Sequence, residues 1–307
     1  MTNTTDPTVQ LSCAVPSGTA TVDIGLRGGG IRAFRFGGRE VIPRDTDIAR
    51  SKWFSGATLA PWPNRLSDAR WTFGGEVLTC PANDVHGNAL HGLVYGRDFE
   101  VVEQQANRVT VACMLGKDAV YPFAVRIALT YVLSEDGLTC TMAARNLSTD
   151  RVPIAFGSHP YFPFDDGCTI TISARKAWEI DDRMIPTGRL VDPSLWGVDP
   201  GSPTDMSAFS ADDCFTDLPR DEHGVAHTVL TYPDGWQTDV WQGRGFDHTV
   251  IFTTRDSLWL EAKAYAVGIE PQTAPTNAFN TGTDLVWLDP AAEFSGQWGI
   301  TVIRPAT

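Results

Sequence analysis

Residues 125–142 of the chain, VRIALTYVLSEDGLTCTM, indicate its fold. Apolar and polar side chains alternate over 125–132 and again over 138–142, as they do in strands with one buried face. The two runs are joined by the turn residues Glu135-Asp136-Gly137. This arrangement predicts a long β-hairpin.

The same pattern extends in both directions along the chain. IRAFRF and REVI, within residues 31–42, are joined by Gly37-Gly38, a pair that supplies the positive φ angles of a tight turn. Further strand-like runs lie at 71–78, 108–112, 168–173, 227–232, 258–264 and 298–303. Helical periodicity is almost absent, so we expect an all-β protein.

Length and composition suit one large domain. The chain has 307 residues, of which 42% are hydrophobic, and shows no internal repeat or linker. We therefore expect a single domain over residues 1–307, with residues 1–8 as a loose leader. Two stretches, 43–63 and 185–217, lack clear periodicity and are expected to be long loops. The predicted architecture is a large antiparallel β-sandwich with these loops over one face.

The net charge and the lack of a recognisable targeting signal limit which partners and which cellular compartment we expect. With 24 Lys and Arg against 37 Asp and Glu, the formal charge is −13, which disfavours nucleic-acid binding. No apolar stretch is long enough to span a membrane, and the N-terminus does not resemble a signal peptide. We expect a cytoplasmic protein. Its six cysteines are accordingly expected to be reduced, and several to be buried.

Two histidines stand in settings that suit catalysis. His159 lies in AFGSHPYFPF (155–164), where three aromatic residues follow it within five positions. A histidine there suits an acid or base in an apolar cleft, or a core histidine bonded to a backbone carbonyl. His91 lies in NALHGLVYG (88–96), either at a bend that a ligand approaches closely or in a surface turn.

Three other residues are candidates for binding or catalysis. Asn64 and Arg65 lie in LAPWPNRL (59–66), where two prolines stiffen a loop that suits recognition of a polar, ring-shaped ligand. Glu270 ends an apolar run in AVGIEPQTAP (266–275), and is either a functional buried carboxylate or a glutamate at the rim of a sheet.

The pair His223 and His227 is not expected to bind a metal. The sequence DEHGVAH (221–227) is typical of a hairpin turn, and a turn breaks the helical spacing that an H-x3-H metal pair needs. We expect no metal and no organic cofactor.

Together these stretches resemble the aldose 1-epimerase (galactose mutarotase) family, in the same order along the chain. The resemblance runs from about Gly25 to Ile303. It rests on Asn64-Arg65, Leu90-His91-Gly92, His159-Pro160-Tyr161-Phe162 and Glu270-Pro271-Gln272. It implies the family's galactose mutarotase-like supersandwich, with an active site in a cleft across one sheet.

The family also has a sugar-binding aspartate in a long loop before the late glutamate. Asp212, in ADDCFTD (211–217), has the family's position along the chain, whereas Asp247, in GFDHT (245–249), matches more letters but comes later. We favour Asp212. Family members also tend to carry a glutamine in the strand before the glutamate, and Val250-Ile251-Phe252 offers none.

The resemblance implies an isomerase that interconverts the α and β anomers of a free aldohexose such as glucose or galactose. Glu270 is then the base and His159 the acid. Asn64, Arg65, His91 and Asp212 bind the sugar, and Trp62, Tyr161 and Phe162 offer aromatic faces to it. The acid is expected to be an imidazolium that nearby carboxylates keep protonated at neutral pH.

The sequence leaves other functions open. A hexose-6-phosphate 1-epimerase would need more Arg or Lys to hold the phosphate. A glycosidase would use two carboxylates, which leaves His159 without a role. A non-catalytic carbohydrate-binding protein would need neither acid nor base, and fold alone does not separate these functions. The sequence gives no expectation about the oligomeric state.

Overall fold

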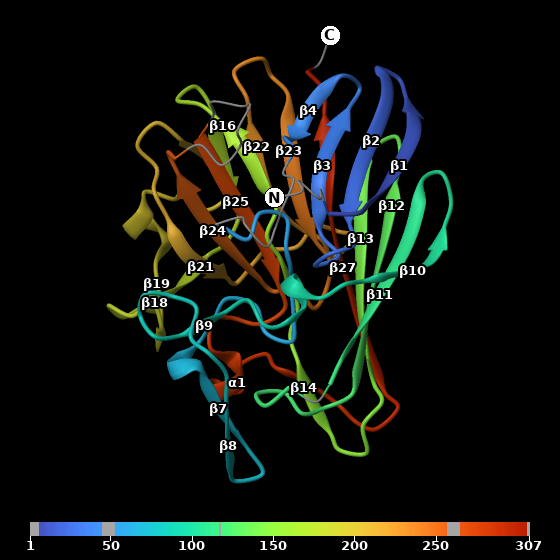
Figure 1. The fold of residues 1–307 in the computed structure, drawn as a ribbon. Coiled ribbons are helices and arrows are strands. Elements are labelled where there is room, and N and C mark those ends of the chain that lie inside the picture. The colour runs from blue at the N-terminus through green and yellow to red at the C-terminus, as the bar shows by residue number, and fades with distance from the viewer. Residues whose placement is uncertain (1–5, 45–52, 117, 257–264, 306–307) are drawn as a thin grey trace, which may run out of the picture.

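The computed structural model describes residues 6–44, 53–116, 118–256 and 265–305, which form mainly antiparallel strands (Figure 1). The largest sheet has nine strands among these residues. In spatial order they are β10 (Glu100–Gln104), β11 (Arg108–Leu115), β12 (Val125–Leu133), β13 (Gly137–Asn146), β27 (Glu293–Ile303), β23 (Gln237–Gln242), β22 (Ala226–Thr231), β17 (Thr169–Ile172) and β20 (Pro203–Asp205).

A second sheet has eight strands among the described residues and carries Asp212, Glu270 and Gln272. Its order is β19 (Pro186–Val191), β18 (Lys176–Ile180), β21 (Asp212–Thr216), β24 (His248–Thr254), β25 (Tyr265–Gln272), β15 (Gly157–Ser158) and β5 (Thr58–Leu59), with β16 (Tyr161–Phe164) paired to β25.

Smaller elements complete the fold. A four-stranded sheet contains β1 (Thr8–Val15), β2 (Gly18–Gly25), β3 (Ile31–Phe36) and β4 (Arg39–Ile42). Three strand pairs are β14 (Val152–Ile154) with β26 (Val286–Leu288), β6 (Arg65–Leu66) with β9 (Ala89–Leu90), and β7 (Arg70–Phe73) with β8 (Glu76–Thr79). The short helices are η1 (Ser67–Ala69), η2 (Val94–Gly96), η3 (Pro193–Trp196) and α1 (Ala278–Thr281).

The hairpin expected at 125–142 is formed by β12 and β13, which pair from Val125 with Asn146 to Leu133 with Leu138. Every second residue of β12 is buried, so the alternation in the sequence corresponds to one face on the core. Buried apolar side chains from the nine-, eight- and four-stranded sheets pack together in one cluster, which includes Val22, Leu129 and Ile269. The expectation of an all-β antiparallel fold is confirmed.

Most other strand predictions also hold. The runs at 31–42 and 71–78 form the hairpins β3–β4 and β7–β8. The runs beginning at 108, 168, 227 and 298 lie largely within β11, β17, β22 and β27. The run at 258–264 lies outside the described residues. Thr8, the last residue of the expected leader, already pairs with Gly25 in β1.

The stretch 185–217 is more ordered than the sequence indicated. It contains β19, η3, β20 and β21, so this long segment is ordered by short elements of its own, and the sequence did not show where these elements lie. The reason is that β19 has exposed or half-exposed side chains at every position, and β20 has only three residues, so neither shows the alternation of a half-buried strand.

The cysteines and the helices bear on two further expectations. All six cysteines are free, and four of them are buried: Cys113, Cys140, Cys168 and Cys214. Among the described residues, no helix is long and apolar enough to cross a membrane.

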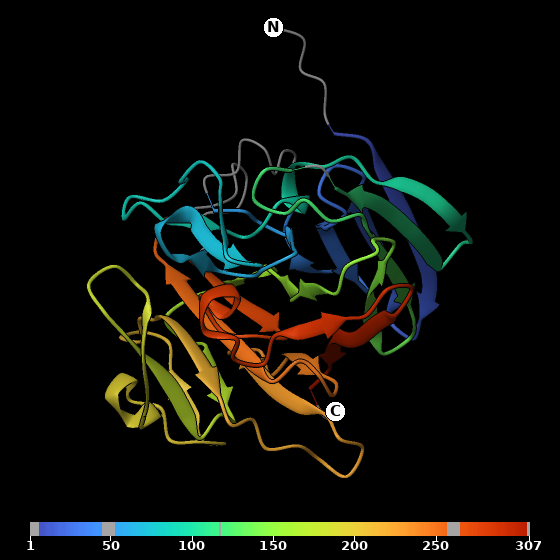
Figure 2. The same cartoon turned by 90° about the horizontal axis from the view of Figure 1, so that it is seen from below.

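The chain between β5 and η2 lies beside the second sheet. Seen from below in Figure 2, this segment is drawn in cyan and lies next to the orange strands β24 and β25. Within this segment the backbone at Gly92 passes very close to the backbone at Ala60. Only glycine fits there without a clash, because a β-carbon at position 92 would lie 2.2 Å from the carbonyl oxygen of Ala60, and because the φ angle of Gly92 is 72°. The segment turns sharply at this point, directly after His91.

We predict that Gly92→Ala lowers the free energy of unfolding by about 2 kcal/mol or more, because the added methyl group clashes with backbone as well as straining φ. Gly87→Ala is the matched control, since Gly87 has a φ of 81° but open space around its β-carbon position. Urea unfolding of both variants separates the two effects. Equal losses at the two positions would contradict a steric role for Gly92.

Candidate functional site

The register of three strands brings polar groups to one face of the eight-stranded sheet. Asp212 of β21 lies opposite Phe252 of β24, which in turn lies opposite Gly268 of β25. Glu270 follows Gly268 by two residues and therefore points to the same side of the sheet. Asp212, Phe252 and Glu270 accordingly all line one cavity.

His159 reaches the same cavity from the segment just before β16. Its backbone is fixed on both sides, because its N–H donates to the carbonyl of Ala57 at 3.0 Å and its own carbonyl accepts from Gly56 at 2.8 Å. Tyr161, which pairs with Gly268, stacks on the His159 ring with centroids 4.8 Å apart. The imidazole is therefore held in place by backbone and by an aromatic neighbour.

The opposite wall comes from the segment containing β6 and β9. Arg65 pairs with Leu90 in this two-stranded ladder, and the N–H of His91 donates to the carbonyl of Asn64 at 2.9 Å. Asn64 and His91 have φ angles of 53° and 67°, which few residues with side chains adopt. Such backbone conformations are frequent at binding sites that a rigid surrounding structure supports.

The cavity between these walls has a volume of about 250 Å³. Pockets for drug-sized ligands range from about 300 to 1,000 Å³, so this one suits a single small ring. All six residues that the sequence singled out as catalytic or sugar-binding line it, and they come from distant parts of the chain. They are Asn64, Arg65, His91, His159, Asp212 and Glu270.

The closest pair of functional groups in the cavity is His159 and Glu270. Nε2 of the imidazole lies 3.2 Å from Oε1 of the carboxyl group, and the two side chains are only 6% and 2% exposed. The second carboxyl oxygen, Oε2, accepts a hydrogen bond from Nε2 of Gln272 at 3.1 Å. One carboxyl group is thus shared between an imidazole and an amide, away from bulk water.

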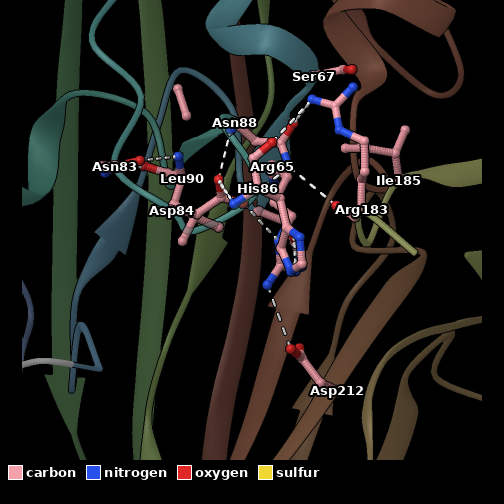
Figure 3. Close-up of polar contacts among 12 residues, drawn as sticks. Arg65, Ser67, Asn83, Asp84, His86, Asn88, Leu90, Arg183, Ile185 and Asp212 are labelled. Carbon is pink, nitrogen blue, oxygen red and sulfur yellow. Dashed lines mark hydrogen bonds and ion pairs between the residues drawn. The ribbon is translucent and has the colours of Figure 1, made fainter. Parts of the chain in front are cut away.

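Arg65 lies between two carboxylates (Figure 3). Its Nε is 3.4 Å from Oδ2 of Asp84, and one of its terminal nitrogens is 3.5 Å from Oδ2 of Asp212. The same guanidinium also donates to Oδ1 of Asn64 at 3.3 Å. It is the one Arg or Lys side chain among the described residues that line the cavity.

Comparison with known proteins identifies the family of the chain. The sequence matches the aldose 1-epimerase family over residues 15–301. The chain belongs to the aldose 1-epimerase family.

Individual relatives in this family are distant. The uncharacterized Escherichia coli protein YihR is 26% identical over 246 residues, which cover 76% of this chain and 74% of that protein. Mouse galactose mutarotase is 25% identical over 170 residues, 52% of this chain and 48% of the mouse protein. The chain therefore matches about half the length of that named enzyme.

The similarity to solved structures is greater in fold than in sequence. The structure of a GalM/aldose epimerase homologue from C. elegans has a TM-score of 0.82 with 17% identity, and the alignment covers 98% of this chain and 100% of that chain. The expected galactose mutarotase-like architecture is therefore confirmed.

Burial controls the protonation of the acid–base pair. It raises the pKa of Glu270 well above its ordinary value, and the charge of Asp212 acts in the same direction. Hydrogen bonding from Gln272 and the charge of Arg65 oppose this rise in the pKa. Burial also lowers the pKa of His159, against the expectation that the imidazole stays charged at neutral pH. Burial disfavours the charged form of each partner and so favours a neutral imidazole beside a protonated carboxyl group.

His91 is a neutral neighbour of this pair. Burial holds the pKa of His91 well below its ordinary value, and the positive charge of Arg65 acts in the same direction. Its ring meets that of His159 edge to face, with centroids 5.1 Å apart. A neutral imidazole at this position can donate or accept a hydrogen bond but does not add charge.

Two of the three aromatic residues expected in the site lie elsewhere. Trp62 is 2% exposed, packs on Phe279 and donates its indole N–H to the carbonyl of Ala89 at 3.4 Å. Phe162 is fully buried in the core, because it follows Tyr161 on β16 and points to the other face. Of the three, only Tyr161 lines the cavity.

The aromatic wall is built instead from residues that the sequence did not identify. Trp53 and Phe252 lie with ring centroids 5.5 Å apart, and Phe252 meets Tyr161 edge to face at 6.1 Å. The ring of Phe54 meets that of His91 edge to face, with centroids 4.7 Å apart. Phe252 occupies the strand where the family tends to have glutamine, so an apolar ring faces the cavity there. Its place in an apolar strand gave no signal of this, because its direction depends on register.

The two aspartates considered as sugar ligands lie in different places. Asp212 lines the cavity, whereas Asp247 forms an ion pair with Arg220 and is not among the described residues that line it. His223 lies in a turn before β22, as expected, and His227 lies in β22, where its ring pairs with Asp239 at 2.8 Å. Within the described residues, no group of three His, Cys, Asp or Glu side chains is placed to hold a metal ion.

The raised pKa of Glu270 predicts how a Glu270→Gln variant unfolds at different pH. In the wild type the folded state keeps a proton that the unfolded chain releases above about pH 4.5. This contribution to stability is present at low pH and is lost as the pH rises through the pKa of the folded state. Glutamine does not titrate. Between pH 5 and pH 8 the free energy of unfolding of the variant therefore rises relative to that of the wild type by about 1 kcal/mol or more. Urea unfolding of both proteins measures the difference. A difference that is flat or shrinks with rising pH would contradict the raised pKa.

Proposed function

We propose that this protein is an aldose 1-epimerase that interconverts the α and β anomers of free aldohexoses such as glucose or galactose. The observation that carries the proposal is the buried contact of 3.2 Å between His159 and Glu270 in a cavity of about 250 Å³. An acid and a base side by side suit a reaction that removes a proton from the anomeric hydroxyl and adds one to the ring oxygen. Membership of the aldose 1-epimerase family supports the reaction type.

In the proposed reaction, Glu270 removes the proton of the anomeric hydroxyl while His159 protonates the ring oxygen. The bond between C1 and the ring oxygen breaks, and a C1=O double bond forms, which gives the open-chain aldehyde. Rotation about the C1–C2 bond then presents the other face of the aldehyde. His159 takes the proton back as the ring oxygen attacks C1, and Glu270 returns its proton to O1.

The site needs a single proton on the pair throughout this cycle. Before ring opening the proton is on His159 and the carboxyl group is ionised; in the open-chain state the proton is on Glu270 and the imidazole is neutral. Burial favours the second distribution, so the resting protonation of the site resembles that of the open-chain state. The hydrogen bond from Gln272 and the charge of Arg65 both stabilise the carboxylate form of Glu270, which lowers the free-energy cost of ionising it.

The remaining polar groups are proposed to bind the sugar. Arg65 and Asn64 offer N–H donors, and His91 offers a neutral imidazole near His159. Asp212 is 36% exposed and can accept hydrogen bonds from sugar hydroxyls. Donors beside the reacting oxygens stabilise the charge that develops as the ring opens.

We predict that Glu270→Gln and His159→Asn each lower kcat for anomer interconversion by about 10²-fold or more. Asp213→Asn is the control, because Asp213 is a buried carboxyl group on β21 whose neighbour Asp212, not Asp213, lines the cavity. NMR exchange between anomers at equilibrium measures the rates, and melting temperatures confirm folding. Folded variants with more than about a tenth of the wild-type rate would remove the two residues from the chemistry.

The pH dependence of kcat should be a broad bell. Because the pKa of His159 is lowered and that of Glu270 is raised, the acid limb reports a second proton entering at His159, and the alkaline limb reports loss of the shared proton from Glu270. In His159→Asn the alkaline limb disappears, because the residual rate then rises as Glu270 ionises. A wild-type profile whose acid limb is centred at or above the ordinary histidine pKa of about 6.5 would contradict this assignment.

Free sugars are expected to be preferred over sugar phosphates. The one cation among the described cavity-lining residues, Arg65, already faces Asp84 and Asp212, and Glu270 adds a third acidic group. A phosphate dianion would meet this negative charge without a free partner. We predict that kcat/KM for glucose 6-phosphate is at least about tenfold lower than for the better of glucose and galactose. The reverse order would identify a hexose-6-phosphate 1-epimerase.

A further inference from the structure

Asp84 is an acidic residue in the lining of the cavity, and the proposed chemistry does not use it. Its side chain is 5% exposed, and it lies in the segment between β8 and β9. Its two oxygens have different surroundings. Oδ1 accepts from the backbone N–H groups of His86 and Asn88, at 3.0 and 2.6 Å, whereas Oδ2 faces Nε of Arg65 at 3.4 Å and accepts from Nδ2 of Asn88 at 3.0 Å. One oxygen shapes the turn, and the other is directed at the arginine.

Asn88 connects this carboxylate to a distant hairpin (Figure 3). Asn88 is fully buried, and its Nδ2 donates both to Asp84 and to the carbonyl of Arg183 at 3.1 Å. Its Oδ1 accepts from Arg183 at 3.2 Å. Arg183 lies between β18 and β19, at the edge of the eight-stranded sheet, and also pairs with Asp68 at 2.7 Å. The turn that holds Asp84 is therefore supported from outside the cavity.

We propose that Asp84 is a positioning residue that holds the guanidinium of Arg65 toward the substrate, with Asn88 and Arg183 keeping Asp84 in place. This inference rests on the proposed function, because it assigns the support of a sugar-binding arginine. Arg65 has a long side chain, and Asp212, its other carboxylate partner, is half exposed on the far wall. Without Asp84 the guanidinium would be free to turn toward Asp212 and across the cavity. A buried carboxylate behind it keeps the terminal nitrogens facing the ligand.

The charge of Asp84 fits this role. Burial acts to raise its pKa, but the hydrogen bonds from Asn88 and His86 and the charge of Arg65 outweigh burial, so the pKa is lowered overall. The carboxylate therefore remains ionised at neutral pH beside the arginine.

The first test observes Arg65 directly and does not depend on activity. In ¹⁵N–¹H spectra, the Nε–H signal of Arg65 is assigned by its loss in Arg65→Gln. We expect Asp84→Asn to shift this signal and to speed its exchange with solvent at least about fivefold, because the anion behind Nε is lost. Asp118→Asn, which breaks the Arg97–Asp118 ion pair elsewhere, is the matched control and should leave it unchanged. An unchanged signal in folded Asp84→Asn would overturn the proposal.

The second test is a double-mutant cycle. Asparagine keeps Oδ1 for the turn, so Asp84→Asn should fold and should lower kcat/KM for the anomers of galactose on the order of tenfold. In the Arg65→Gln background the same change should cost less than about twofold. Equal losses in both backgrounds would mean that Asp84 only maintains the turn, and would overturn the proposal. If the wild type converts no aldose, the proposed function fails, and the signal of Arg65 still decides the role of Asp84.

Discussion

The contact between Nε2 of His159 and Oε1 of Glu270 sets the requirements that the rest of the site meets. Both groups are buried, and burial penalises charge on either one. Burial therefore favours the neutral form of each group, and the hydrogen bond from Gln272 and the charge of Arg65 favour the carboxylate. The proposed ring opening needs such a pair, because the second half of the reaction reverses the proton transfers of the first half.

The sheet provides the geometry for this contact. Antiparallel pairing of β21, β24 and β25 places Asp212, Phe252 and Glu270 on one face, and a shift of one residue would turn all three into the core. The segment that carries Arg65 and His91 closes over this face, and it is fastened by the tight approach at Gly92 and by the network around Asn88. The site therefore depends on contacts between distant segments, such as that of Arg183 with Asn88, which lie 95 residues apart in the sequence.

Much of the fold and the site was accessible from the sequence. Strands with one buried face, such as β12, show alternation, and glycine pairs mark their turns. The edge strand β19 has no buried face, so it gave no such signal. The six candidate residues stand in motifs that resemble a family, and all six line one cavity. Trp62 and Phe162 were misassigned because an aromatic residue near a motif is as well suited to the core as to a ligand.

Other features depend on three-dimensional surroundings alone. Phe252 faces the cavity because of its register, and Asp84 lies behind Arg65 because β6 pairs with β9. The protonation of the His159–Glu270 pair also could not be read from residue types, because it follows from how completely the two side chains are removed from water. These properties arise from packing between distant segments, which a linear pattern does not record.

The most direct measurement of the central claim is polarimetry of freshly dissolved α-glucose and α-galactose with and without the wild-type protein. The account predicts that the optical rotation of at least one of these sugars reaches its equilibrium value faster, at a rate proportional to protein concentration and with no change in that final value. A folded protein that binds the sugar but leaves the rotation to change at the spontaneous rate would contradict the account and would indicate a binding protein instead.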